Sequence, residues 1–393
     1  MDTVAHVFLF ALVYIYPPGE YPQSLLEESF WSVMEDYPIL FGRVQHGADN
    51  GSASVLIDPE LKPLLLFVDR PEDHIALAQE RPLNLLPLRD ERIFAVKVSK
   101  LAHGALSIGL SAHHSVLDGD SMFQLMESWG RAFRGQSKLM PCHDRSLLFS
   151  TGPPARAHPE YFTVPVPIEA LQAKARSSSG PPSTTSVSLY LSPEELVKLK
   201  NWTNPPDQPA GHFASTMDSF IGLVTMVVGA ARDPQYSFRS SNAINGRAKL
   251  GLPPNYFGNA VFTAIMEHRQ EWIGLDQDKI AQAARRVRQG IERTSAEFMR
   301  DTVNYLDTQP RQERIVLSIQ IGKDFIVSSW SGMGLLKPDF GSKPVYAGPV
   351  RIELDGCAFI LDSPQGGLEA CVSINKSVGE RLPGLWQSVR DRL

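Results

Sequence analysis

The chain has 393 residues, of which 43% are hydrophobic and 21% charged, and its formal net charge at pH 7 is -5. This length and apolar content predict a globular protein of two or three domains and exclude a disordered or fibrous one. The near balance of charge argues against nucleic acid or an anionic membrane as the main partner. The three cysteines, Cys142, Cys357 and Cys371, form no Cys-x-x-Cys pair. This argues against a disulfide framework and a thiolate zinc site and favours a reducing compartment.

The most apolar run, residues 4–16, reads as a strand because Pro17 and Pro18 end it. It is too short to cross a bilayer. It lacks the preceding basic residues and the following small-residue cleavage site of a secretory signal. We therefore expect a cytoplasmic protein with no membrane partner.

Apolar residues next recur at helical spacing from Leu25 to Tyr37, which predicts a helix after the first strand. Another amphipathic helix is expected from Met122 to Phe133, directly after the capping residues Asp118 to Ser121. Between the two helices, strand-like runs separated by turn residues lie at residues 53–57, 64–68, 93–98 and 105–112. Residues 113–118 should therefore form a strand-to-helix turn.

From about residue 152 to residue 183 the chain is rich in Pro, Ser and Gly, which is typical of a crossover between two lobes. The pattern then restarts with a strand and a helix, where Ser192 and Glu195 form a capping box with Pro193 at the first helical position. Further helices are expected near residues 216–231, 279–293 and 377–393, and further strands near residues 235–243, 260–266, 325–330 and 368–374. We predict an α/β (α+β) protein with an N-terminal lobe at 1–151, a linker at 152–183 and a C-terminal lobe at 184–393, each lobe a mixed sheet flanked by helices.

The sharpest local motif is Ser-Ala-His113-His114-Ser-Val-Leu-Asp118-Gly119. By alternation along residues 105–112, His114 continues the apolar face of the strand. A neutral histidine can take a proton from a hydroxyl or amine, as a general base does. The competing interpretation is a buried histidine held by hydrogen bonds. Asp118 is either a second catalytic group or an anchor for the turn, and Gly119 suggests a backbone conformation closed to other residues.

The run His114-Ser-Val-Leu-Asp118-Gly119 resembles the His-x-x-x-Asp-Gly motif of the BAHD acyltransferases. That motif is short, and the order of other matches makes the resemblance specific. Tyr37-Pro-x-x-x-Gly42-Arg43 is similar to the turn after the family's first helix. Further similar runs are Pro141-x-x-Asp144-Arg145, Ser215-Thr-Met-Asp218, Asn245-Gly-Arg247, Asn255-Tyr-Phe-Gly-Asn259, Ser328-Ser-Trp330 and Asp339-Phe-Gly341-Ser-Lys-Pro344, which together cover nearly the whole chain.

The resemblance implies a chloramphenicol-acetyltransferase-like fold, in which a solvent channel between the lobes admits an acceptor from one face and an acyl-CoA from the other. His114 at its middle would deprotonate a hydroxyl or amine of a small natural product, which then attacks the thioester without metal or covalent enzyme intermediate. Asp118 would pair with Arg247, and Asp339 would be a distant structural residue. The substrate or CoA channel would include Ser328, Trp330, Asn245 and Gly341, in a protein that acts as a monomer with acyl-CoA as co-substrate. Arg247 and Lys249 either contact phosphates of coenzyme A or carry plain surface charge.

The sequence departs from the family where Ser342 and Lys343 replace the Trp and Gly of its Asp-Phe-Gly-Trp-Gly element. This leaves a second hypothesis open, in which the same scaffold uses His114 for a rearrangement or cyclisation of one substrate without coenzyme A. A third is a protein that only binds a metabolite. His113-His114 also resembles the doubled histidine of peptide-condensation domains, whereas the Asn255–Asn259 run favours the free acyl-CoA enzymes.

Overall fold

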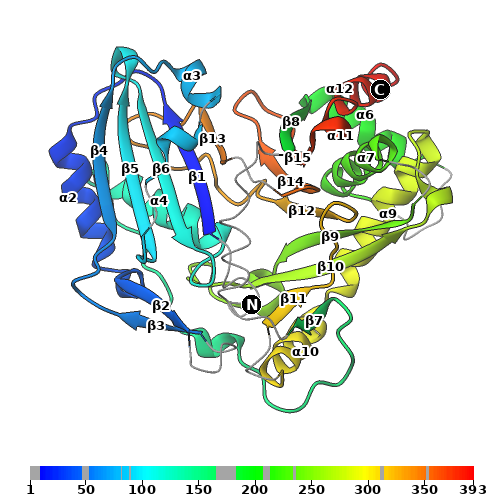
Figure 1. The fold of residues 1–393 in the computed structure, drawn as a ribbon, viewed down its shortest axis with the longest axis horizontal. Coiled ribbons are helices and arrows are strands. Elements are labelled where there is room, and N and C mark those ends of the chain that lie inside the picture. Colours follow the sequence, from blue (N-terminus) through cyan, green and yellow to red (C-terminus); the bar gives the residue numbers. More distant parts are fainter. Residues whose placement is uncertain are drawn as a thin grey trace.

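The computed structural model describes residues 9–46, 53–80, 82–87, 90–164, 183–206, 213–232, 236–309, 314–350 and 354–393. These residues form two lobes that lie side by side, and each lobe is built on one β-sheet with helices packed against it (Figure 1). The predicted α/β class with two lobes is confirmed.

The first lobe holds a five-stranded mixed sheet in the order β13-β1-β6-β5-β4. Its strands are β1 (Leu9–Tyr16), β4 (Leu64–Arg70), β5 (Phe94–Leu101), β6 (Leu106–His113) and β13 (Tyr346–Pro349). β4 and β5 run parallel, and the other neighbours are antiparallel. A hairpin of β2 (Gly42–His46) and β3 (Ala53–Ile57) lies beside this sheet.

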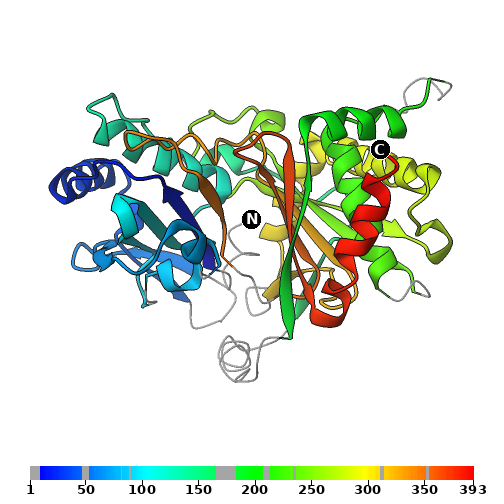
Figure 2. The ribbon, with the colours of Figure 1, turned by 90° about the horizontal axis from the view of Figure 1, so that it is seen from above.

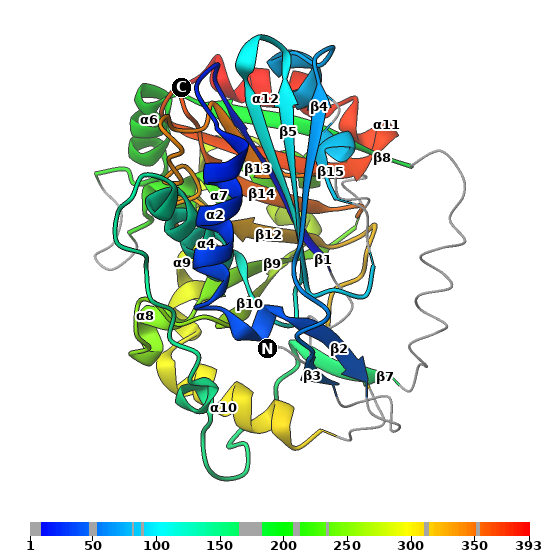
Figure 3. The same cartoon turned by 90° about the vertical axis from the view of Figure 1, so that its left-hand side faces the viewer.

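One face of this sheet carries the core of the first lobe. Leu106, Ile108 and Leu110 alternate along β6 and are fully buried there, as the period of two requires. Two helices cover this face, α2 (Gln23–Met34) and α4 (Gly119–Phe133), and Figure 3 shows them side by side. On the opposite face lies the short helix α3 (Ile75–Glu80), whose Ala78 is buried in a smaller cluster.

The second lobe holds a six-stranded sheet in the order β10-β9-β12-β14-β15-β8. Its strands are β8 (Thr184–Leu191), β9 (Phe238–Asn245), β10 (Val261–His268), β12 (Phe325–Ser329), β14 (Cys357–Asp362) and β15 (Leu368–Asn375). The face turned away from the first lobe (Figure 2) is covered by the helices α6 (Pro193–Thr203), α7 (Thr216–Ala231), α9 (Gln277–Arg293) and α12 (Leu382–Arg390). The other face of the sheet is therefore directed toward the first lobe.

The fold has further strands and helices outside the two large sheets and the helices that cover them. They are the small sheet of β7 (Tyr161–Val164) and β11 (Arg314–Leu317) and the helices α8 (Arg247–Leu250), α10 (Ala296–Asp307) and α11 (Lys376–Gly379). The capping box predicted at the start of α6 is present: the Ser192 hydroxyl accepts from the Glu195 amide at 3.3 Å, and the Glu195 carboxylate accepts from the Ser192 amide at 2.8 Å. The single helix expected at residues 377–393 is wrong. The structure has α11 and α12 there, because Pro383 lacks an amide proton and fits only the first turn of a new helix.

The chain returns to the first lobe after β12, since β13 pairs antiparallel with β1. The proposed division at 1–151, 152–183 and 184–393 does not include this return. Residues 165–182, the centre of the expected linker, lie outside the described residues. Within the part of the chain that the structure describes, no helix is both long and apolar enough to cross a membrane.

Candidate active site

The turn that carries the motif lies where the prediction put it. β6 ends at His113 and α4 begins at Gly119, so residues 114–118 connect a strand to a helix. Asp118 caps the helix by accepting a hydrogen bond from the Ser121 amide at 3.0 Å. The ring of His113 bonds locally, with Nδ1 2.7 Å from the Ser115 hydroxyl.

His114 is half-buried, and its ring meets the ring of Phe10 edge to face, with 5.5 Å between the centroids. Its Nδ1 atom is buried and has no hydrogen-bond partner among the described residues. A histidine kept only for structure is expected to satisfy such an atom, because an unmade buried hydrogen bond costs stability. The Nδ1 atoms of His143 and His268 are buried and unpartnered in the same way in the described chain, so this atom by itself does not separate a general base from a structural histidine.

The side chain of Asp118 is directed to Arg247, as expected from the resemblance. The two terminal nitrogens of the guanidinium donate to the two carboxylate oxygens at 2.8 and 2.9 Å, and the Ala260 amide adds a bond at 3.0 Å. Only 1% of Asp118 and 5% of Arg247 are exposed. Of the two alternatives for Asp118, this geometry favours an anchor over a second catalytic group, since both carboxylate oxygens are already engaged.

This ion pair controls the charge of the turn. Burial alone would raise the pKa of Asp118, but the positive charge and hydrogen bonds of Arg247 outweigh it and hold that pKa below its ordinary value. Burial likewise opposes the charge of Arg247, and Asp118 offsets it so that the pKa of Arg247 is raised. Both groups stay ionised at neutral pH, and Arg247 is neither a surface charge nor open to a phosphate. Lys249 donates to the Thr294 carbonyl at 2.7 Å, at the end of α9.

Asn245 joins the same network without touching His114. Its amide nitrogen donates to the Asp120 carboxylate at 2.7 Å, and its amide oxygen accepts from the Arg247 backbone at 3.1 Å. Asn245 therefore supports the ion pair, and its place in the substrate or CoA channel stays a prediction.

The expected special conformation of Gly119 is wrong. Gly119 is the first residue of α4 and is absent from the positive-φ glycines of the described chain. A Cβ atom there would lie 3.6 Å from the Phe123 ring and 3.7 Å from Trp330 Nε1, which is ordinary contact. The turn is held by its hydrogen bonds and not by a strained glycine.

Trp330 and Ser328 come from the second lobe and lie close to His114 through Phe10. The indole of Trp330 is 4% exposed and packs on Phe10 and Phe123, with centroids 5.2 and 5.5 Å apart. Its Nε1 donates to the Ser328 hydroxyl at 3.2 Å, which fixes the orientation of the ring. Phe10 therefore contacts both His114 and Trp330, and the two lobes meet at this point.

Asp339 and Gly341 lie at the other end of α4. The backbone of Asp339 passes so close to Gly130 that a Cβ there would be 2.7 Å from its nitrogen, and its carboxylate accepts from Arg134 at 3.2 Å. Gly130 is eleven residues after Gly119 in α4, about 16 Å along the helix. Gly341 is exposed beside Asp339, with a φ of 95°. The structure brings neither residue to His114, and the structural role of Asp339 near the channel and the channel role of Gly341 stay predictions.

Several contacts of the motif escaped the prediction. They come from Phe10, Arg145, Asn259 and Ala260, which lie far from the motif in the sequence. The run from Asn255 to Asn259 was the one available signal, because asparagine and glycine favour a turn with polar side chains.

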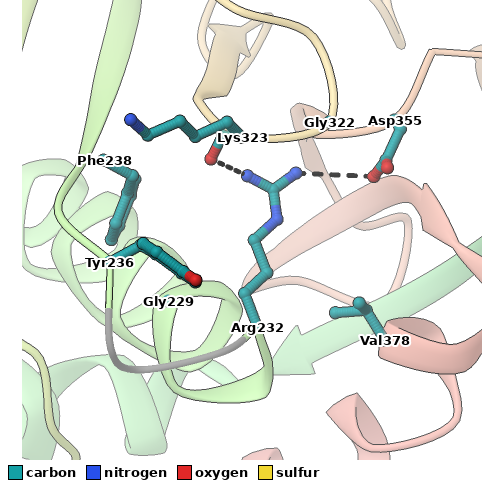
Figure 4. A pocket seen from close by; sticks show the side chains of 8 residues that line it. All are labelled: Gly229, Arg232, Tyr236, Phe238, Gly322, Lys323, Asp355 and Val378. Carbon is teal, nitrogen blue, oxygen red and sulfur yellow. Dashed lines mark hydrogen bonds and ion pairs between the residues drawn. The ribbon is translucent and has the colours of Figure 1, made fainter.

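A separate hollow of about 470 Å³ opens on the second lobe (Figure 4). It is lined by Gly229, Arg232, Tyr236, Phe238, Gly322, Lys323, Asp355 and Val378. The guanidinium of Arg232 lies in it between the Lys323 carbonyl and the Asp355 carboxylate, so this cation is already bound within the protein. No predicted site residue lines this hollow.

Comparison with known proteins identifies the family and the fold. The family model described as the Transferase family, that of the BAHD acyltransferases, matches residues 4–378. Among curated relatives, Hydroxycinnamoyltransferase 1 of Oryza sativa is 28% identical over 74% of this chain and 67% of its own length. Rosmarinate synthase of Plectranthus scutellarioides is 26% identical over 86% of this chain and 80% of its own.

Solved structures share the fold. TRI101 of F. sporotrichioides, complexed with coenzyme A and T-2, superposes with a TM-score of 0.80 at 18% identity, over 98% of this chain and 97% of its own. Vinorine synthase gives a TM-score of 0.72 at 17% identity over 99% and 92%. These matches place the two lobes in the chloramphenicol-acetyltransferase-like class. With the family model matching residues 4–378, the chain belongs to the BAHD acyltransferases, which are acyl-CoA-dependent enzymes.

Proposed function

We propose that the protein transfers an acyl group from a coenzyme A thioester to a hydroxyl or amine of a small natural product, with His114 as general base. The observation that carries the proposal is the position of His114, whose ring contacts Phe10 where the two lobes meet, on a turn whose acidic residue is fully engaged by Arg247. Because Asp118 is so bound, we assign the proton transfer to His114.

One histidine serves both proton transfers of the proposed reaction. His114 takes the proton of the acceptor as its oxygen or nitrogen attacks the thioester carbonyl. The tetrahedral oxyanion then collapses, the carbon–sulfur bond breaks, and the thiolate recovers the proton from the imidazolium as free coenzyme A. A thiol ionises near pH 8.5, which makes it a suitable leaving group.

The surrounding residues take supporting roles in this proposal. Asp118, Gly119, Arg247 and Asn245 hold the turn, and Asp339 fixes the far end of α4. In this proposal Ser328 and Trp330 line the channel between the lobes: Trp330 contacts Phe10, which contacts His114, and Ser328 accepts from the Trp330 indole. Gly341, which is exposed beside Asp339, stays a predicted channel residue.

The donor class follows from the relatives. Several of them are hydroxycinnamoyltransferases, including Shikimate O-hydroxycinnamoyltransferase of Nicotiana tabacum and Putrescine hydroxycinnamoyltransferase 3 of Oryza sativa. We propose a hydroxycinnamoyl-CoA as the first donor to try, with shikimate and putrescine as an alcohol and an amine acceptor. The monomeric state and the cytoplasmic location stay predictions.

The test combines binding with turnover. Coenzyme A binding is measured by calorimetry, and thiol release is followed with acetyl-CoA and a hydroxycinnamoyl-CoA in the presence of each acceptor. The His114→Ala variant should still bind coenzyme A but should lose on the order of 10² to 10⁴ in rate. His74→Ala is the control, because His74 is exposed before α3, where its Nδ1 accepts from the Leu77 amide at 3.3 Å, and turnover should stay close to the parent.

Two outcomes would contradict the proposal. Full turnover in His114→Ala would show that His114 is not the general base. No binding of any coenzyme A species to the folded protein would remove the donor and favour the rearrangement without coenzyme A that the altered Ser342-Lys343 element left open.

A further inference from the structure

The turn that carries His114 is held at every second residue. The His114 backbone carbonyl accepts from the side-chain amide of Asn259 at 2.7 Å, and the Val116 backbone carbonyl accepts from the Arg145 guanidinium at 2.8 Å. The Asp118 carboxylate is bound by Arg247. Three donors from outside the turn therefore fix its path from the end of β6 to the start of α4.

Asn259 reaches the turn from the second lobe. It lies just before β10, and only 2% of it is exposed. The preceding residue, Gly258, accepts from the Ser121 hydroxyl at 3.0 Å and from Arg247 at 3.0 Å. Because its neighbours on both sides are bound to the same network, Asn259 has little freedom to follow the turn if the turn moves.

Arg145 reaches the turn from the segment after α4, and that segment is fastened to the same part of the second lobe. Cys142 donates its amide to the Asn255 carbonyl at 2.8 Å and accepts from the Phe257 amide at 2.8 Å. Gly258 lies so close that a Cβ there would be 2.8 Å from an Arg145 nitrogen. Asn259 and Arg145 thus act as one unit that spans both lobes.

We propose that Asn259 and Arg145 are positioning residues, which set where the His114 ring lies by holding the backbone carbonyls of residues 114 and 116. This inference rests on the proposed function of His114. In this proposal, neither side chain touches the acceptor or the acyl-CoA. A displacement of about 1 Å in a catalytic group can cost on the order of 10² in rate, so loss of either bond should slow chemistry more than binding.

The test uses bromoacetyl-CoA, which needs no acceptor. A ring nitrogen of His114 attacks the CH₂ carbon, a carbon–nitrogen bond forms, bromide leaves, and the alkylated ring loses its proton to water. Mass spectrometry of the digested protein locates the adduct, and its rate is fitted to a saturation constant and a maximal rate. In Asn259→Ala and Arg145→Gln the maximal rate should fall on the order of tenfold to 10²-fold, while the saturation constant stays near that of the parent. Arg145→Lys should recover part of the rate.

Matched controls remove bonds of the same kind elsewhere. Gln277→Ala loses a bond from a side-chain amide to the Trp202 carbonyl, at 2.9 Å, and Arg300→Gln loses a bond to the Leu250 carbonyl, at 3.2 Å. Both controls should alkylate at the parent rate. Thermal unfolding and coenzyme A binding of each variant separate a displaced base from a protein that is no longer folded.

The outcomes separate the two proposals. Failure of the parent protein to form an adduct at His114 would overturn the general base and this inference with it. Equal maximal rates in the parent, Asn259→Ala and Arg145→Gln, with an adduct at His114, would overturn the positioning role alone. A rise in the saturation constant without a fall in the maximal rate would also overturn it, because both residues would then act on coenzyme A binding.

Discussion

The Asp118 carboxylate and the Arg247 guanidinium meet side by side, with both terminal nitrogens of Arg247 bound to the two oxygens of Asp118. Asp118 belongs to the first lobe and Arg247 to the second, so this ion pair joins the lobes at the turn that carries His114. Its burial makes it sensitive to loss of either partner.

Removal of Arg247 should therefore be costly. Arg247→Met leaves the Asp118 carboxylate buried without its counter-charge, which is expected to lower the free energy of unfolding by about 3–5 kcal/mol. Arg43→Met is the control, because the ion pair of Arg43 with Glu91 is exposed, with 43% and 56% of the side chains accessible. That change should cost less than about 1 kcal/mol. Urea unfolding measures the free energy of unfolding of both variants. Losses of equal size would contradict the prediction that the buried ion pair is more sensitive than the exposed one.

The pH dependence of stability follows from the same carboxylate. The pKa of Asp118 in the folded protein lies below the ordinary 3.8, so the folded state holds the charge more firmly than the unfolded chain. Its contribution is present in full above about pH 4 and is lost as the pH falls through the lower folded pKa. Acid unfolding of Asp118→Asn should show a shallower dependence on pH in this range than the parent. Parallel curves would contradict the prediction.

His268, in the second lobe, should destabilise the protein in mild acid. Burial and the nearby Arg286 lower its pKa to about 3 from 6.5, so the unfolded chain takes up the proton first. Stability present above pH 6.5 is then lost as the pH falls toward 3, by up to about 1.4 kcal/mol per pH unit. The His268→Gln variant, which cannot titrate, should lose less stability than the parent between neutral pH and about pH 5. Identical losses on chemical unfolding would show that His268 is not held neutral.

Two helical glycines should respond oppositely to alanine. In α4, a Cβ at Gly130 would lie 2.7 Å from the Asp339 backbone, and overpacking of this kind costs about 1–3 kcal/mol. In α12, a Cβ at Gly384 meets nothing within 4 Å, so alanine should add about 0.5–1 kcal/mol through helix propensity. Thermal unfolding should show Gly130→Ala to be less stable and Gly384→Ala to be more stable than the parent. Stabilisation of both variants would show that α4 does not pack on the Asp339 segment in this way.

Much of the local structure could be predicted because it depends on neighbours in the chain. The alternation in β6, the cap at Asp118 and the capping box at Ser192 are set by residues within a few positions of each other. The prediction failed where the signal was ambiguous. At Gly119 a glycine suggested a special backbone conformation, but an ordinary first residue of a helix suits glycine as well.

The sequence by itself determined the periodic strands and helices, the turn that presents His114, and the set of motifs that indicate the family. Only the tertiary structure decided which distant residues meet that turn. Asn259 and Phe10 reach His114 across 145 and 104 positions of the chain. β13 returns to the first sheet although its sequence lies among the strands of the second. Contacts of this kind depend on how the two lobes pack against each other. The two residues of each contact lie far apart in the chain, so no periodic pattern in a single sequence indicates that they meet.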